Sequence, residues 1–408
     1  MIKVKISKPL PIVVTAALMA GMIALSAAVK VNRPKPEATE APAMSRKAQA
    51  DSEEKEMRGV WITYMDLSME NESDKSEGAF RRKFSKIAEN CKNFGFNTLI
   101  VQARPFCDAI YDSKLFPSSH ILSGEQGKSA GYDALKAVCE ICSEKELSVH
   151  AWINPYRVTS NKTPAKLSED NPCVKDESLV LKTGEGIILD PSNEKARKLV
   201  EDGVLEIAEN YDVDGIQFDD YFYPADIEDQ DSAQYKAYLS AAPKNSAMSL
   251  ETWRSFNVNL LISETYLALH KNCPGVAFGI SPQGNLGNNQ GLSADVVSWC
   301  EKRGYIDYIC PQIYFSLNNP ALGFEAALED WTELDFAEGV KLYVGLAGYK
   351  AGSDADEGTW LSASDILAQE VNILNKNKEV SGFMLYAYPS LLDENAAAEI
   401  KNLREAIR

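Results

Sequence analysis

The sequence alternates strand-like and helix-like stretches from residue 57 onward. Apolar runs rich in β-branched and aromatic residues are separated by segments whose apolar residues recur every three to four positions, as in 77–94. The predicted strands are 58–63, 96–102, 147–153, 214–218, 276–280, 306–310, 340–346 and 382–387. Strands that alternate with helices pair in parallel. Eight such units predict an α/β fold, the closed (β/α)₈ or TIM barrel.

A doubly wound open sheet is the alternative fold for the same alternation. That fold requires a glycine-rich phosphate loop such as GxGxxG after the first strand. The residues that follow the first predicted strand, TYMDLS at 63–68, contain no glycine. The barrel is therefore favoured, and it directs attention to the carboxyl ends of the strands, where barrels carry their active sites.

The first 56 residues predict two segments that precede the barrel. Three lysines among the first eight residues are followed by an uncharged apolar run over 9–29. Residues 1–30 are therefore predicted to be a signal peptide or an N-terminal membrane anchor. Residues 31–56 are rich in proline and charge, without apolar periodicity, and predict a flexible linker. The barrel is expected over 57–408 and outside the cytoplasm, either secreted or held at the cell membrane.

Charge and residue usage exclude several classes of function. The net charge of −17 argues against nucleic-acid binding, which needs a basic face. The three histidines, His120, His150 and His270, are too scattered in the sequence for a zinc hydrolase. No metal and no cofactor are expected. The eight cysteines fall mostly within apolar patterns, which predicts buried thiols.

The segment 215–224, GIQFDDYFYP, carries the strongest catalytic signal. Its strand-like start ends in two adjacent acids, Asp219 and Asp220, followed by an aromatic loop that ends at a proline. Paired carboxyls whose pKa values differ can run acid and base chemistry in one site. The alternative is a pair of turn-capping aspartates. Because the pair falls at the carboxyl end of the fourth barrel strand, we predict that both are catalytic.

The other predicted strand ends are rich in aromatic, amide and guanidinium side chains. Aromatic faces stack on sugar rings, and the polar groups bind hydroxyls, so this set predicts a glycan-binding surface. The alternative for each residue is a strand-end cap or packing within the barrel. Trp61 and Trp152 are interpreted either as residues that stack on sugars or as core residues, and core packing is favoured. The predicted substrate-binding residues are Gln102, Arg104, Asn154, Tyr156, Tyr221, Gln283, Asn285, Gln312, Tyr314 and Tyr386.

Several long motifs resemble the glycosyl-hydrolase-like 10 family. They are RGVWIT, GFNTLIVQARPFCDAIY, SVHAWINPYRV, ILDPSN, VDGIQFDDYFYP, GISPQGN and YIDYICPQIYF, in this order. The resemblance implies a TIM-barrel glycosidase, often exported, with relatives that act on peptidoglycan glycan strands. We therefore expect an exported glycoside hydrolase that cleaves O-glycosidic bonds in polysaccharides containing N-acetylhexosamine, with peptidoglycan as the expected substrate.

The adjacent acids also resemble those of N-acetylhexosaminidases that use the acetamido group of the substrate as nucleophile. By this resemblance Asp219 orients the acetamido group, Asp220 is the general acid and base, and Tyr314 contacts the acetamido group. Neighbouring strand residues point to opposite sides. Both acids therefore reach one cleft only if the chain bends after the strand.

Two alternatives to this mechanism remain open. One is a conventional two-carboxylate glycosidase acting on another polysaccharide. Its second carboxyl would come from Asp66, Asp108, Glu264 or Asp307. The other alternative is a barrel that binds glycans without cleaving them.

Overall fold

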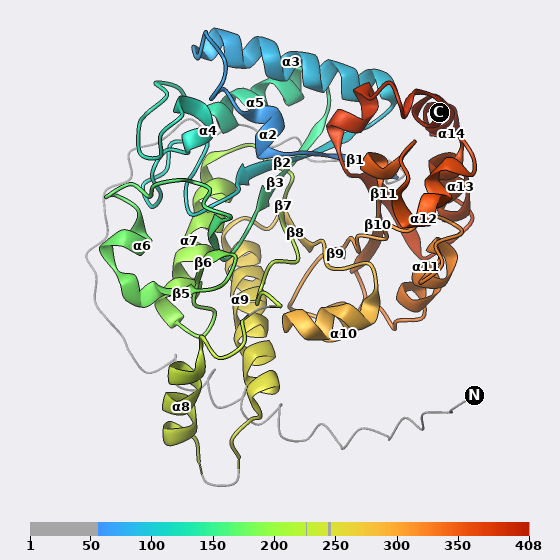
Figure 1. Ribbon diagram of the computed structural model, residues 1–408. Helices are drawn as coiled ribbons and strands as arrows, with labels where there is room; N and C mark the ends of the chain where they lie inside the picture. The colour runs from blue at the N-terminus through green and yellow to red at the C-terminus, as the bar shows by residue number, and fades with distance from the viewer. Residues whose placement is uncertain (1–55, 226, 244–245, 408) are drawn as a thin grey trace, which may run out of the picture. The chain divides into compact units, whose positions relative to one another are not determined.

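The computed structural model describes residues 56–225, 227–243 and 246–407. Within these residues eight parallel strands close into a barrel in the order β1-β11-β10-β9-β8-β7-β3-β2 (Figure 1). The prediction of a (β/α)₈ barrel is confirmed, with a strand at each predicted place. The barrel strands are β1 (Met57–Ile62), β2 (Thr98–Arg104), β3 (Ser148–Ile153), β7 (Gly215–Phe218), β8 (Ala277–Ile280), β9 (Tyr308–Ile309), β10 (Lys341–Leu346) and β11 (Val380–Leu385).

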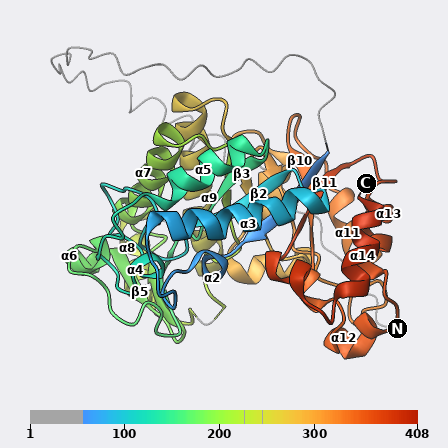
Figure 2. The ribbon, with the colours of Figure 1, turned by 90° about the horizontal axis from the view of Figure 1, so that it is seen from above.

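One helix after each barrel strand packs around the outside of the barrel (Figures 1 and 2). These helices are α3 (Glu77–Phe94), α5 (Ala134–Glu144), α7 (Glu194–Asn210), α9 (Leu250–Asn272), α10 (Val296–Glu301), α11 (Phe324–Thr332), α13 (Ile366–Leu374) and α14 (Ala397–Ala406). Shorter helical turns occupy the connections. These are α2 (Tyr64–Leu67), α4 (His120–Ser123), α6 (Pro172–Lys175), η1 (Glu177–Leu179), η2 (Leu286–Leu292), η3 (Gly348–Lys350), α12 (Ala355–Gly358), η4 (Thr359–Leu361) and η5 (Tyr388–Leu392).

Helix α3 illustrates how the sequence sets these elements. The hydroxyl of Ser76 accepts a hydrogen bond from the backbone N–H of Ala79 and caps the first turn. The buried residues Phe80, Phe84, Ile87, Ala88 and Cys91 recur on one face, which packs toward the strands. Gly95 ends the helix with φ of 111°, a left-handed conformation that glycine adopts without a steric penalty.

The interior of the barrel is filled by large side chains. Trp61, Trp152 and Tyr308 pack there as part of a second buried cluster, distinct from the core between strands and helices. Glycines make room for them, because a Cβ on Gly279 would lie 2.1 Å from the ring of Tyr308. A 2.9 Å hydrogen bond joins Nδ1 of His150 to the hydroxyl of Tyr308. Burial lowers the pKa of His150 to about 4, so the imidazole in the barrel is neutral.

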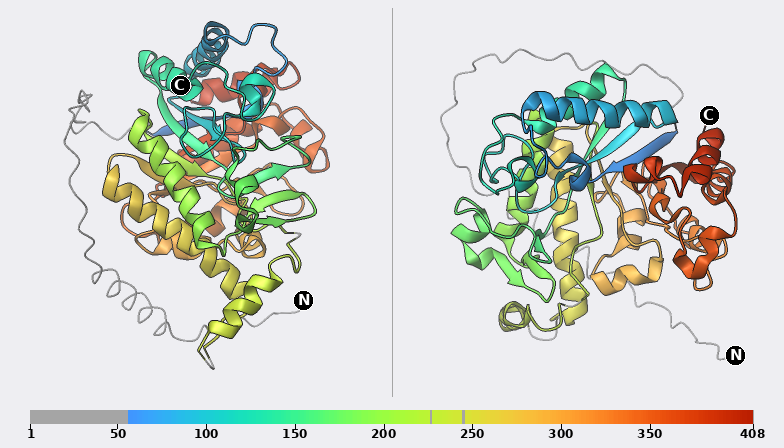
Figure 3. Two further views of the ribbon diagram at one scale, coloured as in Figure 1. Left: turned by 90° about the vertical axis from the view of Figure 1, so that its left-hand side faces the viewer. Right: turned by 45° about the horizontal axis from the view of Figure 1, so that its top comes forward.

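Two long connections between barrel strands contain secondary structure of their own. The segment after β3 forms a three-stranded antiparallel sheet from β4 (Arg157–Ser160), β5 (Val180–Lys182) and β6 (Gly186–Leu189), and the segment after β7 forms α8 (Ser232–Ala241). Strands of three or four residues are too short for a recognisable alternation. Figure 3 shows α8 beside the N-terminal half of α9. None of its residues is buried, and it contacts α9 through Tyr235 and Tyr238, whose ring centroids lie 5.3 and 6.0 Å from that of Trp253.

The export segment predicted over 1–30 lies outside the described residues, as does the linker over 31–56 apart from Glu56. Across residues 56–407, apart from the three undescribed positions in that range, no helix is both long enough and apolar enough to cross a bilayer. All eight cysteines are buried, as their apolar surroundings in the sequence predicted.

Candidate active site

The two adjacent acids line the same cleft at the carboxyl end of the barrel. Strand β7 ends at Phe218, and the backbone bends at Asp220, whose carbonyl accepts a 3.0 Å hydrogen bond from Phe222 N–H. Asp219 and Asp220 therefore lie beyond the strand, where neighbouring side chains need not point to opposite sides. The bend that a shared cleft requires is present. The cleft has a volume of about 440 Å³. Its lining residues are Trp61, Trp152, Gln217, Asp219, Asp220, Tyr221, Ser281, Gln283, Gln312, Tyr314, Tyr349 and Tyr386.

Asp219 is held by a relay of amide side chains from the neighbouring strands. The Asn154 side-chain amide donates to its Oδ2. Gln102 in turn donates to Asn154 Oδ1 over 2.7 Å, and Gln102 Oε1 accepts from the backbone N–H of Tyr64 over 2.9 Å. Gln102 and Asn154 are thus placed behind the acid, where they orient it, and they are absent from the described lining of the cleft.

Asp220 is held by two glutamines from the next two strand ends. The Gln283 side-chain amide donates to Oδ2, and Gln312 Nε2 lies 3.3 Å from Oδ1. Gln312 Nε2 also donates to the carbonyl of Ser281 over 2.9 Å, which fixes its orientation. Both glutamines were predicted to bind substrate, and the structure places both in the cleft against an acid.

Burial perturbs the protonation of the pair. Asp219 is 4% exposed, and the loss of solvation raises its pKa to about 7. The positive charge of Arg157 acts in the opposite direction, and the negative charge of Asp220 raises this pKa further. Burial also raises the pKa of Asp220, against the hydrogen bond from Gln283. Two adjacent carboxyls with raised pKa values are suited to acid and base catalysis.

Three tyrosines form one wall of the cleft. The rings of Tyr314, Tyr349 and Tyr386 lie with centroids 5.7–5.8 Å apart. Trp61 meets Tyr386 edge-on at 5.9 Å, and its indole N–H donates to Gln217 over 2.7 Å. This wall comes from the ends of β9, β10, β11 and β1, which are neighbours in the barrel, and it offers a sugar ring an aromatic surface.

Arg157 places a positive charge close to both acids. Its guanidinium lies 5.2 Å from the ring centroid of Phe106 and 5.5 Å from that of Tyr221. Its Nε donates to the carbonyl of Pro105 over 2.7 Å. Its charge lowers the pKa of both Asp219 and Asp220. Arg157 was absent from the predicted site residues, although it directly follows the polar end of the third strand.

Three predicted substrate-binding residues lie away from the cleft. The guanidinium of Arg104 sits 4.5 Å from the Phe116 ring centroid, and burial lowers its pKa. The pairing of β2 with β3 shifts register between Gln102 and Arg104, so two residues that share a face in a regular strand diverge here. Tyr156 is fully buried, and the side chain of Asn285 caps η2 by accepting from Gly287 N–H over 3.0 Å.

The candidate second carboxyls also lie elsewhere. Asp66 caps α2 through Thr63, and Asp307 accepts from Phe278 N–H over 2.7 Å at the start of β9. Asp108 bonds Gln126, and Glu264 pairs with Arg197 at 3.5 Å. Among the described residues that line the cleft, Asp219 and Asp220 are the only carboxyls. In the described part of the chain no group of three His, Cys, Asp or Glu side chains is arranged to hold a metal ion.

Gln217, Ser281 and Tyr349 line the cleft but were not among the predicted site residues. Gln217 carries a usable signal, because it is the one polar side chain in the strand GIQF, and it points into the barrel toward Trp61. Tyr349 lies beyond β10, in a loop whose path the sequence does not predict. Trp61 and Trp152, for which core packing was favoured, both pack in the barrel core and line the cleft from below.

The fold and the site together define a (β/α)₈ barrel enzyme built for acid–base chemistry in an aromatic cleft. The family model glycosyl hydrolase-like 10 matches residues 56–362. The glycosyl hydrolase YngK of Bacillus subtilis (strain 168) is 33% identical over 366 residues, which cover 84% of this chain and 70% of that protein. The glycosyl hydrolase DigH of Escherichia coli (strain K12) is 27% identical over 368 residues, covering 81% of this chain and 82% of that protein.

Solved structures share the fold at low sequence identity. The glycoside hydrolase domain of PgaB (BpsB) from Bordetella bronchiseptica matches 86% of this chain and 99% of its own length, with a TM-score of 0.57 and 14% identity. Alpha-L-fucosidase isoenzyme 2 from Paenibacillus thiaminolyticus matches 86% of this chain and 49% of its own length, with a TM-score of 0.54 and 13% identity. The chain belongs to the glycosyl hydrolase-like 10 family, and its enzyme class is that of the glycoside hydrolases.

Proposed function

We propose that the protein hydrolyses O-glycosidic bonds in polysaccharides that contain N-acetylhexosamine, by substrate-assisted catalysis. One observation carries the proposal: the carboxyls of the adjacent residues Asp219 and Asp220 line one cleft, with no other carboxyl among its described lining residues. In substrate-assisted hydrolysis the acetamido oxygen of the sugar takes the place of an enzyme nucleophile. Two neighbouring acids are then sufficient, one for the acetamido group and one for the leaving oxygen.

The surroundings of the two acids favour distinct roles. Asp219 accepts hydrogen bonds from Asn154 and, over 3.4 Å, from Tyr221 N–H, and Arg157 favours its charged form. As a carboxylate it would accept the acetamido N–H and orient the carbonyl oxygen toward the anomeric carbon. Asp220 would donate its proton to the leaving oxygen, then take a proton from the water that opens the oxazolinium intermediate. Tyr314 would contact the acetamido group.

Peptidoglycan glycan strands are the proposed substrate. Their alternating N-acetylated sugars offer the acetamido group that the mechanism uses, and the amides and tyrosines of the cleft suit neutral sugar hydroxyls and ring faces. The apolar run over 9–29, with its basic flank, supports export of the barrel. We propose that the protein is secreted or anchored to the membrane by this segment. Detection of the chain in membrane and culture-medium fractions of producing cells tests the location.

Digestion of purified glycan strands, with and without stem peptides, tests the activity. Mass analysis of the products would show hydrolytic cleavage by the wild type. Asp220→Asn should abolish turnover while the protein still binds the strands. Asp335→Asn is the matched control, because Asp335 is exposed on a connection outside the cleft. Binding without turnover by the wild type on every glycan would contradict the enzymatic proposal and support a glycan-binding barrel.

An acetamido-thiazoline inhibitor separates the two catalytic mechanisms, because it mimics the oxazolinium intermediate. Strong inhibition of strand cleavage is expected. An active enzyme that this compound does not inhibit would contradict substrate assistance and support a conventional pair of carboxyls acting on another polysaccharide.

A further inference from the structure

The cleft presents two exposed tyrosines that come from different strand ends. Tyr221 is 56% exposed and Tyr349 is 52% exposed, whereas the other aromatic residues of the cleft are buried or half-buried. Tyr221 follows β7 and Tyr349 follows β10, and β8 and β9 separate these strands in the barrel. The Asp220 carboxylate is bound by Gln283 and Gln312, at the ends of β8 and β9, so it lies between the strand ends that carry the two rings. Exposed aromatic surface beside a polar catalytic centre is suited to stacking on sugars.

The ring of Tyr349 is fixed from behind. Its backbone N–H donates to the carbonyl of Tyr386 over 3.1 Å. The rings of Tyr314 and Tyr386 meet it edge-on, at interplanar angles of 80° and 90°. A ring held in this way loses little conformational entropy when a sugar stacks on it.

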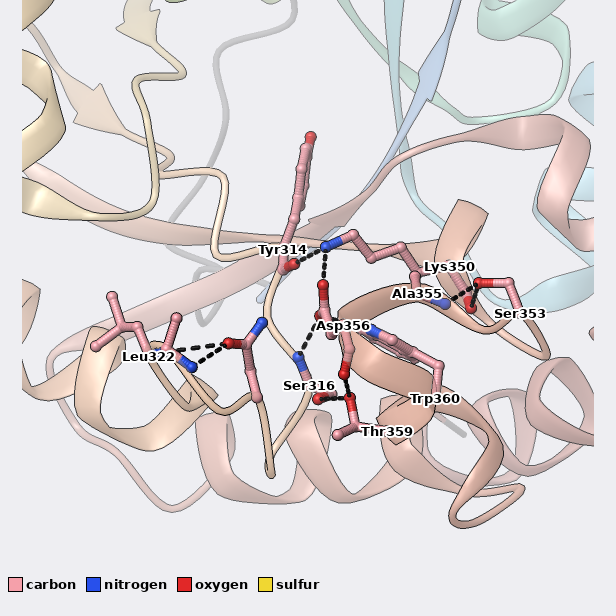
Figure 4. Close-up of polar contacts among 11 residues, drawn as sticks. Tyr314, Ser316, Leu322, Lys350, Ser353, Ala355, Asp356, Thr359 and Trp360 are labelled. Carbon is pink, nitrogen blue, oxygen red and sulfur yellow. Dashed lines mark hydrogen bonds and ion pairs between the residues drawn. The ribbon is translucent and has the colours of Figure 1, made fainter.

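The loop that carries Tyr349 is anchored by a cluster of half-buried polar groups (Figure 4). Lys350 Nζ donates to the carbonyl of Tyr314 over 2.7 Å and pairs with Asp356 Oδ1 at 2.8 Å. The indole of Trp360 donates to Asp356 Oδ2 over 2.9 Å. Figure 4 shows the Tyr314 ring pointing away from this cluster. The cluster thus ties the β9 and β10 loops together beneath the tyrosine wall.

The backbone conformation of this loop depends on the same contacts. Asp356 and Glu357 adopt φ of 53° and 59°, a left-handed conformation that is unfavourable for residues other than glycine. Such strain persists only where surrounding contacts hold it. Lys350 and Trp360 supply these contacts through the Asp356 carboxylate. Asp356 is therefore a positioning residue for the tyrosine wall.

Tyr221, at the end of β7, is held by different contacts. The guanidinium of Arg157 lies 5.5 Å from its ring centroid, and its backbone N–H bonds Asp219. Its position is thus coupled to the acid pair itself. More than half of the residue remains exposed beside the cleft.

We propose that Tyr221 and Tyr349 are stacking platforms for sugar residues on the two sides of the cleaved bond, so that the enzyme cuts within glycan chains. The inference rests on the proposed function and adds the mode of attack. An enzyme that removes terminal sugars needs an aromatic platform on one side of its acids. Platforms on both sides bind a chain that continues in both directions and distribute its binding energy across the scissile bond.

Peptide-free glycan strands fractionated by length test this inference. With wild-type enzyme we expect the first products to be fragments of intermediate length, and kcat/KM to rise with strand length. Tyr221→Ala and Tyr349→Ala should each lower kcat/KM on long strands about five- to tenfold, mainly by raising KM, because each removes the burial of one ring face. Tyr349→Phe, which keeps the ring, should recover most of this loss. Leu267→Ala, an exposed apolar residue on α9, is the control.

Two results would overturn the inference. If the earliest products are only monosaccharides or disaccharides released from chain ends, the enzyme does not cut within chains, although the proposed function stands. If both alanine variants match wild type on long strands, the tyrosines are not platforms. Failure of the wild type to cleave strands of any length would instead remove the proposed function, and this inference with it.

Discussion

Asp219→Asn should abolish activity and stabilise the protein, and the size of the stabilisation should depend on pH. Burial raises the pKa of Asp219 from its ordinary value of 3.8 to about 7. The folded protein therefore binds this proton more tightly than the unfolded chain. As pH rises from about 4 to about 7, the unfolded state loses the proton first, and the free energy of unfolding falls.

The magnitude follows from the pKa difference. The two pKa values differ by about three units, and each unit corresponds to about 1.4 kcal/mol. The free energy of unfolding therefore falls by at most about 4 kcal/mol above pH 7. Asparagine carries no charge at any pH and keeps an oxygen that can accept from Asn154. Near pH 4 the variant and the wild type should have the same free energy of unfolding. At pH 8 that of the variant should be higher by about 2–4 kcal/mol.

Urea unfolding followed by circular dichroism at pH 4, 6 and 8 measures this difference. Asp356→Asn is a control of opposite sign. Burial acts to raise the pKa of Asp356, but hydrogen bonds that include those from Lys350 and Trp360 outweigh it and lower the pKa. Its contribution to stability is present above its ordinary pKa and lost as pH falls. A variant of Asp219 that is less stable at pH 8, or whose difference from wild type is the same at every pH, would refute the reasoning.

Three further predictions concern other parts of the site. Arg157→Met removes the charge that lowers the pKa of Asp219. The acidic limb of the pH profile of kcat/KM should therefore move to higher pH. An unchanged limb would show that this charge does not act on the catalytic group. Asp356→Asn should raise KM for long glycan strands several-fold with little change in kcat, as steady-state kinetics would show, whereas a fall in kcat alone would contradict a positioning role. Gly279→Ala should destabilise the fold by about 2–3 kcal/mol in thermal or urea unfolding, because the added Cβ would lie 2.1 Å from the Tyr308 ring. No change in stability would mean that the side chains inside the barrel rearrange to make room for the methyl group.

The proposed division of roles within the acid pair links these predictions to the proposed mechanism. Asp219 is bound to the amide relay of Asn154 and Gln102, whereas Asp220 is bound to the glutamines at the ends of β8 and β9. Two carboxyls with different hydrogen-bond partners can hold different protonation states although they are adjacent in sequence. This difference is the physical basis for assigning one acid to orientation and the other to proton transfer.

The sequence by itself determined the barrel and the location of its acids. Eight alternating strand and helix patterns are a signal spread over the whole body of the chain, so small errors at element boundaries do not change the fold prediction. The carboxyl ends of parallel strands meet at one side of a barrel, and from this rule alone Asp219, Asp220, Gln283, Gln312 and Tyr386 are expected together, as the cleft has them.

Only the tertiary structure decided which way individual side chains point. A register shift between β2 and β3 turned Arg104 out of the barrel, whereas Gln102 remained within reach of Asn154. The bend after β7 brought both acids into one cleft, and the loop after β10 placed Tyr349 at its rim. Register shifts, bends and loop paths result from contacts between residues far apart in the chain. Local sequence patterns do not encode such contacts, and the orientation of each side chain therefore emerged only with the folded barrel.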